Sequence, residues 1–167
     1  MQHYVFSGKY LMKIWKYLSA NKIFLDIALE NKEKLIQFLA QIPEKLGYAA
    51  SMDDVAERLR NREKTMSTGI GNGVAIPHAV HPNIADPILV FVRPESPLEF
   101  DALDNEPVDI IFGLIMPERK THLHIRLLAG ISRLCKNQAF AEAARTINDP
   151  VILLENIRAL EKDMAFH

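Results

Sequence analysis

A histidine that directly follows a proline is the residue of this chain best suited to chemistry. His78 closes the stretch REKTMSTGIGNGVAIPH, which runs from 62 to 78. The ring of Pro77 holds its own φ at about −65° and so restricts the backbone beside the imidazole. The unperturbed pKa of histidine is about 6.5, so near neutral pH one ring nitrogen keeps its lone pair. His78 is therefore a candidate nucleophile, acid–base group or metal ligand.

The glycines upstream of His78 have two interpretations. Gly69, Gly71 and Gly73 lack a β-carbon, which would let their backbone N–H groups approach an anion closely. Asn72-Gly73 is also a strong type I′ turn signal, and taken alone it favours a simple β-hairpin. Nucleotide motifs do not fit, because a Walker loop ends in Gly-Lys-Ser/Thr and the dinucleotide pattern needs glycine where Val74 stands.

Zinc binding and serine hydrolysis are rival chemistries. Four histidines are numerous enough for a metal site: His78, His81, His122 and His124. His122 and His124 are two residues apart on a predicted helix, however, so they point to different sides of it. Ser67 lacks the G-x-S-x-G context of a hydrolase nucleophile. We therefore predict no metal site and no cofactor.

Phosphoryl transfer accommodates all of these features. His78 would be the nucleophile, and Arg62 would offer a planar guanidinium to the phosphate oxygens. Positioning and electrostatic stabilisation carry most of the catalysis in such reactions. His122, at a predicted helix start, could donate a hydrogen bond to the transferring group, although a satisfied, partly buried histidine is the better interpretation of His122 taken alone.

Helices are predicted on the N-terminal side of the glycine stretch. Apolar residues at helical spacing predict a helix over 32–47, which Pro43 would kink. Ser51 resembles a helix cap, and the helix that it opens would carry Arg62 to its C-terminal end. The short basic amphipathic segment 9–18 is expected to dock on its own domain rather than on a membrane.

Two strands and two further helices are predicted beyond His78. The apolar runs ILVFV (88–92) and VDIIFGLIM (108–116) are bounded by prolines, as expected of buried strands. A helix follows over 121–137 with Thr121 as its cap, and an Asp-Pro pair opens the last helix over 151–162. Helices before, between and after strands predict a single layered α/β domain.

Composition narrows the classes of function. With 20 basic and 21 acidic residues the net charge is −1, so we expect no nucleic-acid partner. Cys135 is the only cysteine, which excludes an internal disulfide and fits the cytoplasm. The longest apolar run is too short to cross a bilayer and no secretory leader is visible, so we expect no stable membrane insertion.

The run REKTMSTGIGNGVAIPHA (62–79) closely resembles the phosphorylation-site motif of enzyme IIA domains of the phosphoenolpyruvate-dependent phosphotransferase system, in the fructose–mannitol class. The similarity continues through FDALDNEPVDIIFGLIMP (100–117) and THLHIRLLAGISRL (121–134). It implies a mannitol-type enzyme IIA fold, with a mixed sheet flanked by helices on both faces. That domain would span 12–167, leaving 1–11 as an N-terminal extension.

The resemblance also implies roles for individual residues. His78 would be phosphorylated, as tele-phosphohistidine, by a phosphocarrier protein of the HPr type, and His122 and Arg62 would lie beside it; His124 is not carried over. A phosphate-binding loop would be formed by Ser67, Thr68, Gly69, Gly71 and Gly73. The chain would be a phosphotransferase that passes the group to an enzyme IIB. The motifs look most like the nitrogen-regulatory branch, so a regulator switched by phosphorylation stays open as the alternative.

Overall fold

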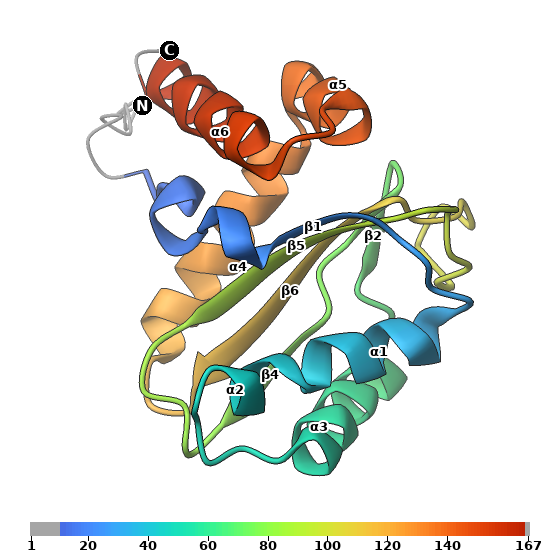
Figure 1. Cartoon of the computed structure of the whole chain (residues 1–167), viewed down its shortest axis with the longest axis vertical. Helices are drawn as coiled ribbons and strands as arrows, with labels where there is room; N and C mark the ends of the chain where they lie inside the picture. Colours follow the sequence, from blue (N-terminus) through green and yellow to red (C-terminus); the bar gives the residue numbers. More distant parts are fainter. Residues whose placement is uncertain (1–10, 166–167) are drawn as a thin grey trace, which may run out of the picture.

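The computed structural model describes residues 11–165, and within this range a six-stranded mixed sheet lies between two groups of helices (Figure 1). The strands are β1 (Ile23–Ile27), β2 (Gly69–Gly71), β3 (Val74–Ala75), β4 (His78–His81), β5 (Ile88–Pro94) and β6 (Ile110–Pro117). Their order is β1-β5-β6-β3-β2, and β4 also pairs with β6. The central strand β6 is antiparallel to β5 on one side and parallel to β3 and β4 on the other.

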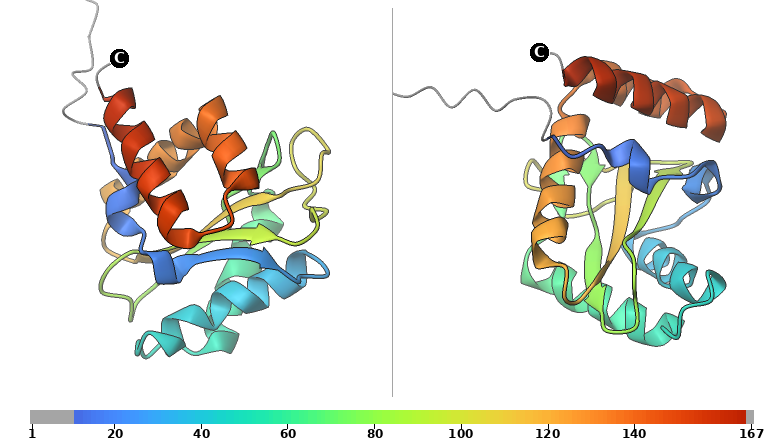
Figure 2. Two further views of the ribbon diagram at one scale, coloured as in Figure 1. Left: turned by 45° about the horizontal axis from the view of Figure 1, so that its top comes forward. Right: turned by 90° about the vertical axis from the view of Figure 1, so that its left-hand side faces the viewer.

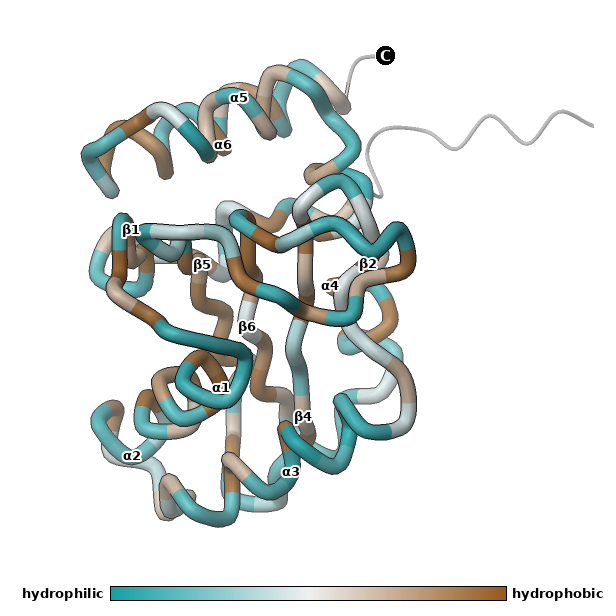
Figure 3. Tube along the Cα trace, turned by 90° about the vertical axis from the view of Figure 1, so that its right-hand side faces the viewer, coloured by the Kyte–Doolittle hydropathy of each residue, from teal (hydrophilic) through white to brown (hydrophobic). Residues whose placement is uncertain are grey.

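Alternating side chains on β6 build a core on each face of the sheet. Ile111 and Ile115 pack into one core, whereas Phe112 and Leu114 pack into the other, as the two-residue period of a strand requires. Figure 3 shows the hydrophobic residues gathered along β5 and β6. A Cβ on Gly113 would lie 2.6 Å from a methyl group of Leu39, so the glycine lets the first helix approach β6 closely.

Helices cover both faces of the sheet (Figure 2). The first core is covered by α1 (Lys32–Ala40), α2 (Ile42–Lys45) and α3 (Met52–Thr65). The second is covered by α4 (Thr121–Cys135), α5 (Gln138–Thr146) and α6 (Pro150–Met164), together with the 3₁₀ helix η2 (Ile14–Tyr17). The 3₁₀ helix η3 (Ala20–Lys22) contacts α6 and β5. The predicted fold, a mixed sheet flanked by helices on both faces, is confirmed.

Several predicted helix boundaries are also confirmed, and two are wrong. Ser51 caps α3 by accepting from the Asp54 N–H, and Asp149 caps α6. The helix predicted over 32–47 is instead broken into α1 and α2, because Pro43 cannot donate to the preceding turn. Thr121 is not a cap: α4 begins at this residue, and no side chain caps it.

The segment that precedes the sheet is tied to the last helix. Of the predicted amphipathic segment 9–18, residues 9 and 10 lie outside the described range, as does most of the predicted extension 1–11. Ile14 is fully buried, and Glu161 of α6 accepts hydrogen bonds from the backbone N–H groups of Ile14 and Trp15 at 2.9 Å each. This segment therefore docks on its own domain, as predicted.

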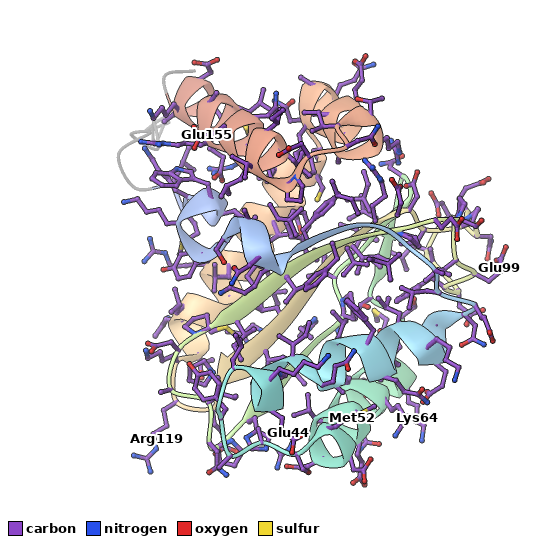
Figure 4. The ribbon with its side chains drawn as sticks, in the orientation of Figure 1. Glu44, Met52, Lys64, Glu99, Arg119 and Glu155 are labelled. Carbon is purple, nitrogen blue, oxygen red and sulfur yellow. The ribbon has the colours of Figure 1, made fainter. Side chains whose placement is uncertain are left out.

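Charged side chains occupy the outer surface. Lys64, Glu99 and Arg119 are exposed and point away from the sheet (Figure 4). Among the helices within residues 11–165, none is both long enough and apolar enough to cross a membrane.

Candidate functional site

His78 stands at the start of an edge strand, between α3 and α4. The strands β3 and β4 pair with successive parts of β6, and Ile76 and Pro77 form the short break between them. The Pro77 carbonyl still accepts from the N–H of Leu114 at 3.0 Å, so the backbone remains anchored to β6 through the break. The proline therefore delivers His78 to a fixed position at the edge of the sheet.

Hydrogen bonds define which nitrogen of His78 carries the proton. Nδ1 lies 2.7 Å from the carbonyl oxygen of Ile76, and since a carbonyl only accepts, Nδ1 must be the donor. Nε2 is then left with its lone pair, and it accepts from Nε–H of Arg62 at 3.2 Å. Burial lowers the pKa of His78, and the charge of Arg62 lowers it further. The ring is therefore neutral near neutral pH, with a nucleophilic nitrogen facing Arg62.

Arg62 is held in the last turn of α3. Its Nη1 donates to the carbonyl oxygen of Met66 at 2.9 Å, just beyond the end of the helix. The guanidinium thus spans from the end of its own helix to the imidazole of His78. The structure brings these two predicted site residues together.

A pocket of about 370 Å³ opens beside the two residues. It is lined by Arg58, Asn61, Arg62, His78, Ala79, Val80 and His124. Two arginines in one pocket make it suitable for an anion. Arg58 is oriented by its contacts with Asp54, at 3.1 Å, and with the Val80 carbonyl, at 3.3 Å.

His124, not His122, lies against His78. The rings of His78 and His124 meet edge to face, with centroids 5.3 Å apart and an interplanar angle of 79°. His122 is exposed and does not line the pocket. Two steps along an α-helix turn a side chain by about 200°, so the first turn of α4 can direct only one of the two histidines toward β4.

The predicted phosphate-binding loop forms a hairpin and does not line the pocket. Asn72 and Gly73 both have positive φ, 55° and 77°, as a type I′ turn between β2 and β3 requires. The alternative interpretation of the glycines, a β-hairpin, is the one observed. A Cβ on Gly69 would lie 2.8 Å from the Cβ of Ala102, so this glycine permits close packing against a neighbouring loop.

The hydroxyl residues of the same loop are engaged elsewhere. Ser67 Oγ donates to the Phe100 carbonyl at 2.7 Å and accepts from the Gly69 N–H. Thr68 is buried, and both its N–H and its hydroxyl bond to Glu63. The polar atoms of Ser67 and Thr68 are thus bonded to other residues of the protein. They hold the shape of the loop that leads to His78.

Within residues 11–165, His81 and Cys135 have structural roles. His81 is buried, with Nε2 2.7 Å from Asp54 and Nδ1 accepting from the Asn83 N–H. Cys135 is buried, and burial strongly raises the pKa of its thiol. Over the part of the chain that the structure describes, no three histidine, cysteine or acidic side chains are arranged to hold a metal.

Sequence reasoning missed three polar residues of the pocket, Arg58, Asn61 and His124. Arg58 is four positions before Arg62, so a helix-face argument could have placed both guanidinium groups on one side of α3. Asn61 lies next to Arg62 but carries no comparable signal. His124 could not have been chosen over His122, since the choice depends on the rotation of α4 against the sheet.

Known proteins resemble this chain in both sequence and fold. Residues 16–159 match a family model described as "Phosphoenolpyruvate-dependent sugar phosphotransferase system, EIIA 2". A nitrogen regulatory protein of Klebsiella oxytoca is 33% identical over 134 residues, which is 79% of this chain and 82% of that protein.

Solved structures show the same arrangement. The Nitrogen Regulatory Protein IIA-Ntr of Neisseria meningitidis superimposes with a TM-score of 0.81 at 32% identity, covering 86% of this chain and 98% of its own. In the complex of enzyme IIAMTL and phosphorylated enzyme IIBMTL from Escherichia coli, one chain matches at a TM-score of 0.67 and 21% identity, covering 83% of this chain and 97% of that one. At that identity the second likeness concerns the fold alone.

Proposed function

The chain belongs to the EIIA 2 family of the phosphoenolpyruvate-dependent sugar phosphotransferase system, and from this premise we propose that it carries a phosphoryl group on Nε2 of His78. The observation that carries the proposal is the 2.7 Å contact between Nδ1 and the Ile76 carbonyl. It holds the proton on Nδ1 and leaves the Nε2 lone pair at the mouth of a pocket that contains two arginines.

The proposed step moves one phosphoryl group between two imidazoles. The donor is a phosphocarrier protein of the HPr type that bears a phosphohistidine. The Nε2 lone pair of His78 attacks phosphorus, the carrier's P–N bond breaks, and its electron pair returns to the carrier's ring nitrogen. His78 needs to lose no proton, because the Ile76 carbonyl keeps Nδ1–H in place as the ring acquires positive charge. The balance requires no metal or cofactor.

Arg62 has two positions in this proposal. Before transfer its Nε–H occupies the lone pair of Nε2, and that bond must open as the phosphoryl group arrives. The guanidinium then binds the phosphoryl oxygens, where charge accumulates during transfer. The contact of Nη1 with the Met66 carbonyl keeps Arg62 close throughout.

The protein's output is proposed to be regulatory. The nitrogen regulatory proteins among its relatives support a regulatory role. In this proposal the protein works in the cytoplasm, and phosphorylation of His78 switches the surface around the pocket. A phosphoryl group adds about −1.5 to −2 charges to a side chain at pH 7, enough to change which partner a surface attracts. The second candidate is onward transfer to an enzyme IIB, the kind of partner named in the mannitol complex.

Reconstitution tests the proposal directly. The protein is mixed with phosphoenolpyruvate, enzyme I and the HPr-type carrier, and its intact mass is measured. We expect a gain of one phosphoryl group in the wild type and none in His78→Ala. Equal phosphorylation of His78→Ala would overturn the assignment of the acceptor. Adding an enzyme IIB then separates the two outputs, since only a transport component passes the group on.

A further inference from the structure

A carboxylate of α3 is enclosed behind the loop that leads to the site. The side chain of Glu63 is only 8% exposed, and its charge is paired with Lys32 of α1 at 3.0 Å. Its two oxygens also accept from Thr68, one from the N–H at 3.0 Å and the other from the hydroxyl at 2.6 Å. A buried ion pair loses its water, so apolar side chains of the same size often stabilise a fold equally well. This pair therefore calls for a role other than stability.

Hydrogen bonds connect Glu63 to the reactive imidazole in three steps. Glu63 binds Thr68, and the carbonyl oxygen of Thr68 accepts from the N–H of Ile76 at 3.0 Å. The carbonyl oxygen of Ile76 in turn accepts from Nδ1 of His78 at 2.7 Å. Thr68 and Ile76 flank the hairpin of β2 and β3, so the path crosses its open end. The N–H and the carbonyl of one residue belong to different peptide groups, so the path transmits position and not electronic polarisation.

We infer that Glu63 is a positioning residue for phosphoryl transfer, because it fixes the Ile76 carbonyl that keeps the proton on Nδ1 of His78. The inference rests on the proposed function, in which Nε2 attacks phosphorus. A neutral imidazole that bears its proton on Nε2 has no lone pair there and cannot attack. A carbonyl displaced from Nδ1 allows that tautomer to form. The position of Ile76 therefore controls what fraction of the protein is reactive.

The charge of Glu63 also affects His78, although the carboxylate does not line the pocket. Burial lowers the pKa of His78, and the bond to the Ile76 carbonyl raises it. Of the nearby charges, Arg62 lowers that pKa and Glu63 raises it. The other charged or titratable groups around the ring come from α3 and α4: Arg58 and His124. The charged groups around Glu63 itself come from α1 and from the segment between β5 and β6: Lys32 and Asp101. Loss of the Glu63 charge should therefore lower the pKa of His78.

Glu63→Gln tests the inference with little change in size. The glutamine oxygen can replace one carboxylate oxygen, but the amide nitrogen only donates, so one of the two bonds from Thr68 is lost. We expect a smaller fraction of His78 with its proton on Nδ1, measured from the ring ¹⁵N chemical shifts at about pH 8, where the ring is neutral. Phosphorylation by the carrier should slow about fivefold, equivalent to a net hydrogen bond of about 1 kcal/mol. Glu57→Gln is the matched control, because it removes an exposed carboxylate from the same helix and should behave as the wild type.

Two further readouts separate positioning from a general loss of structure. The carrier concentration that gives half the maximal rate should not change in Glu63→Gln, because this residue lies outside the pocket; only the maximal rate should fall. The acid limb of the pH profile should move to lower pH, because the lost negative charge had raised the pKa of His78. Thr68→Val removes the hydroxyl bond but keeps the N–H bond and the Glu63 charge. It should also slow phosphorylation, while its acid limb stays in place.

The positioning role and the proposed function fail in different ways. If the carrier does not phosphorylate the wild type but Glu63→Gln changes the tautomer of His78, the proposed function is wrong and the control of the tautomer stands. If the wild type is phosphorylated, and both Glu63→Gln and Thr68→Val keep its tautomer fraction and its rate, the positioning role is wrong. Slower phosphorylation with an unchanged tautomer and an unchanged acid limb would also overturn it, since a purely structural residue has that effect.

Discussion

Replacing Arg62 tests the proposed site most sharply, because this residue has two separable effects on His78. The first is donation: Arg62→Ala removes the guanidinium that now bonds to Nε2 at 3.2 Å and would bind the phosphoryl oxygens. One lost donor of this kind costs about 10²-fold in rate, equivalent to about 2.7 kcal/mol of transition-state stabilisation. The second is charge, since the positive guanidinium contributes to the lowered pKa of His78.

The two effects predict different pH profiles for two variants. His78 reacts only when neutral, so the phosphorylation rate falls as pH drops through its pKa. In Arg62→Ala that pKa moves upward, toward its ordinary value of about 6.5, and the acid limb of the profile should move to higher pH. Arg62→Lys keeps the charge, so its acid limb should stay in place while the rate falls through loss of the planar fork.

The assay is single-turnover phosphorylation by the phosphorylated carrier, quenched over time at a series of pH values. Arg60→Ala is the control, because Arg60 is on the same helix but pairs with Glu33 and lies outside the pocket. The reasoning fails if Arg62→Ala stays within about threefold of the wild type at every pH, since a lost donor should exceed that.

Four further outcomes are expected. Gly73→Ala should lose more stability to denaturant than Gly47→Ala, because both have positive φ, costing about 1–2 kcal/mol, but only at Gly73 would a Cβ meet an ion pair at 2.6 Å. Glu161→Ala should lose about 1–3 kcal/mol for each of the two backbone N–H groups that it strands, and hydrogen exchange of both amides should quicken. His78 and His124 have lowered pKa values in the folded protein, so below about pH 6.5 the unfolded chain binds more protons than the folded one. The free energy of unfolding should therefore fall as pH drops through that value, and replacing both histidines with glutamine should make it depend less on pH. Chelator treatment should leave the carrier-dependent step unchanged; if stoichiometric zinc restored a lost activity, a metal site would replace the phosphohistidine.

Local features of the fold could be predicted from the sequence because neighbouring residues determine them. Asp149 followed by Pro150 suits the cap and first turn of a helix, and Asn72-Gly73 supplies the two positive φ angles that a tight hairpin needs. The alternating faces of β6 follow from the apolar run 108–116, although its place at the centre of the sheet does not. His78 and its proline were similarly evident, as was the arginine at the end of α3.

The composition of the pocket was decided by tertiary structure. The conformational freedom of the glycines fits an anion-binding loop as well as a hairpin. Only the packing of the loop against 100–104 directs them away from His78. The choice between His122 and His124 depends on how α4 is rotated about its axis. That rotation is set by Leu127 and Ile131, which are fully buried in the core beneath the helix. Residues two positions apart on a helix point in different directions, so only one of the two histidines can face the reacting nitrogen. The sequence motif contains both, and the packing of α4 on the core determines which one it is.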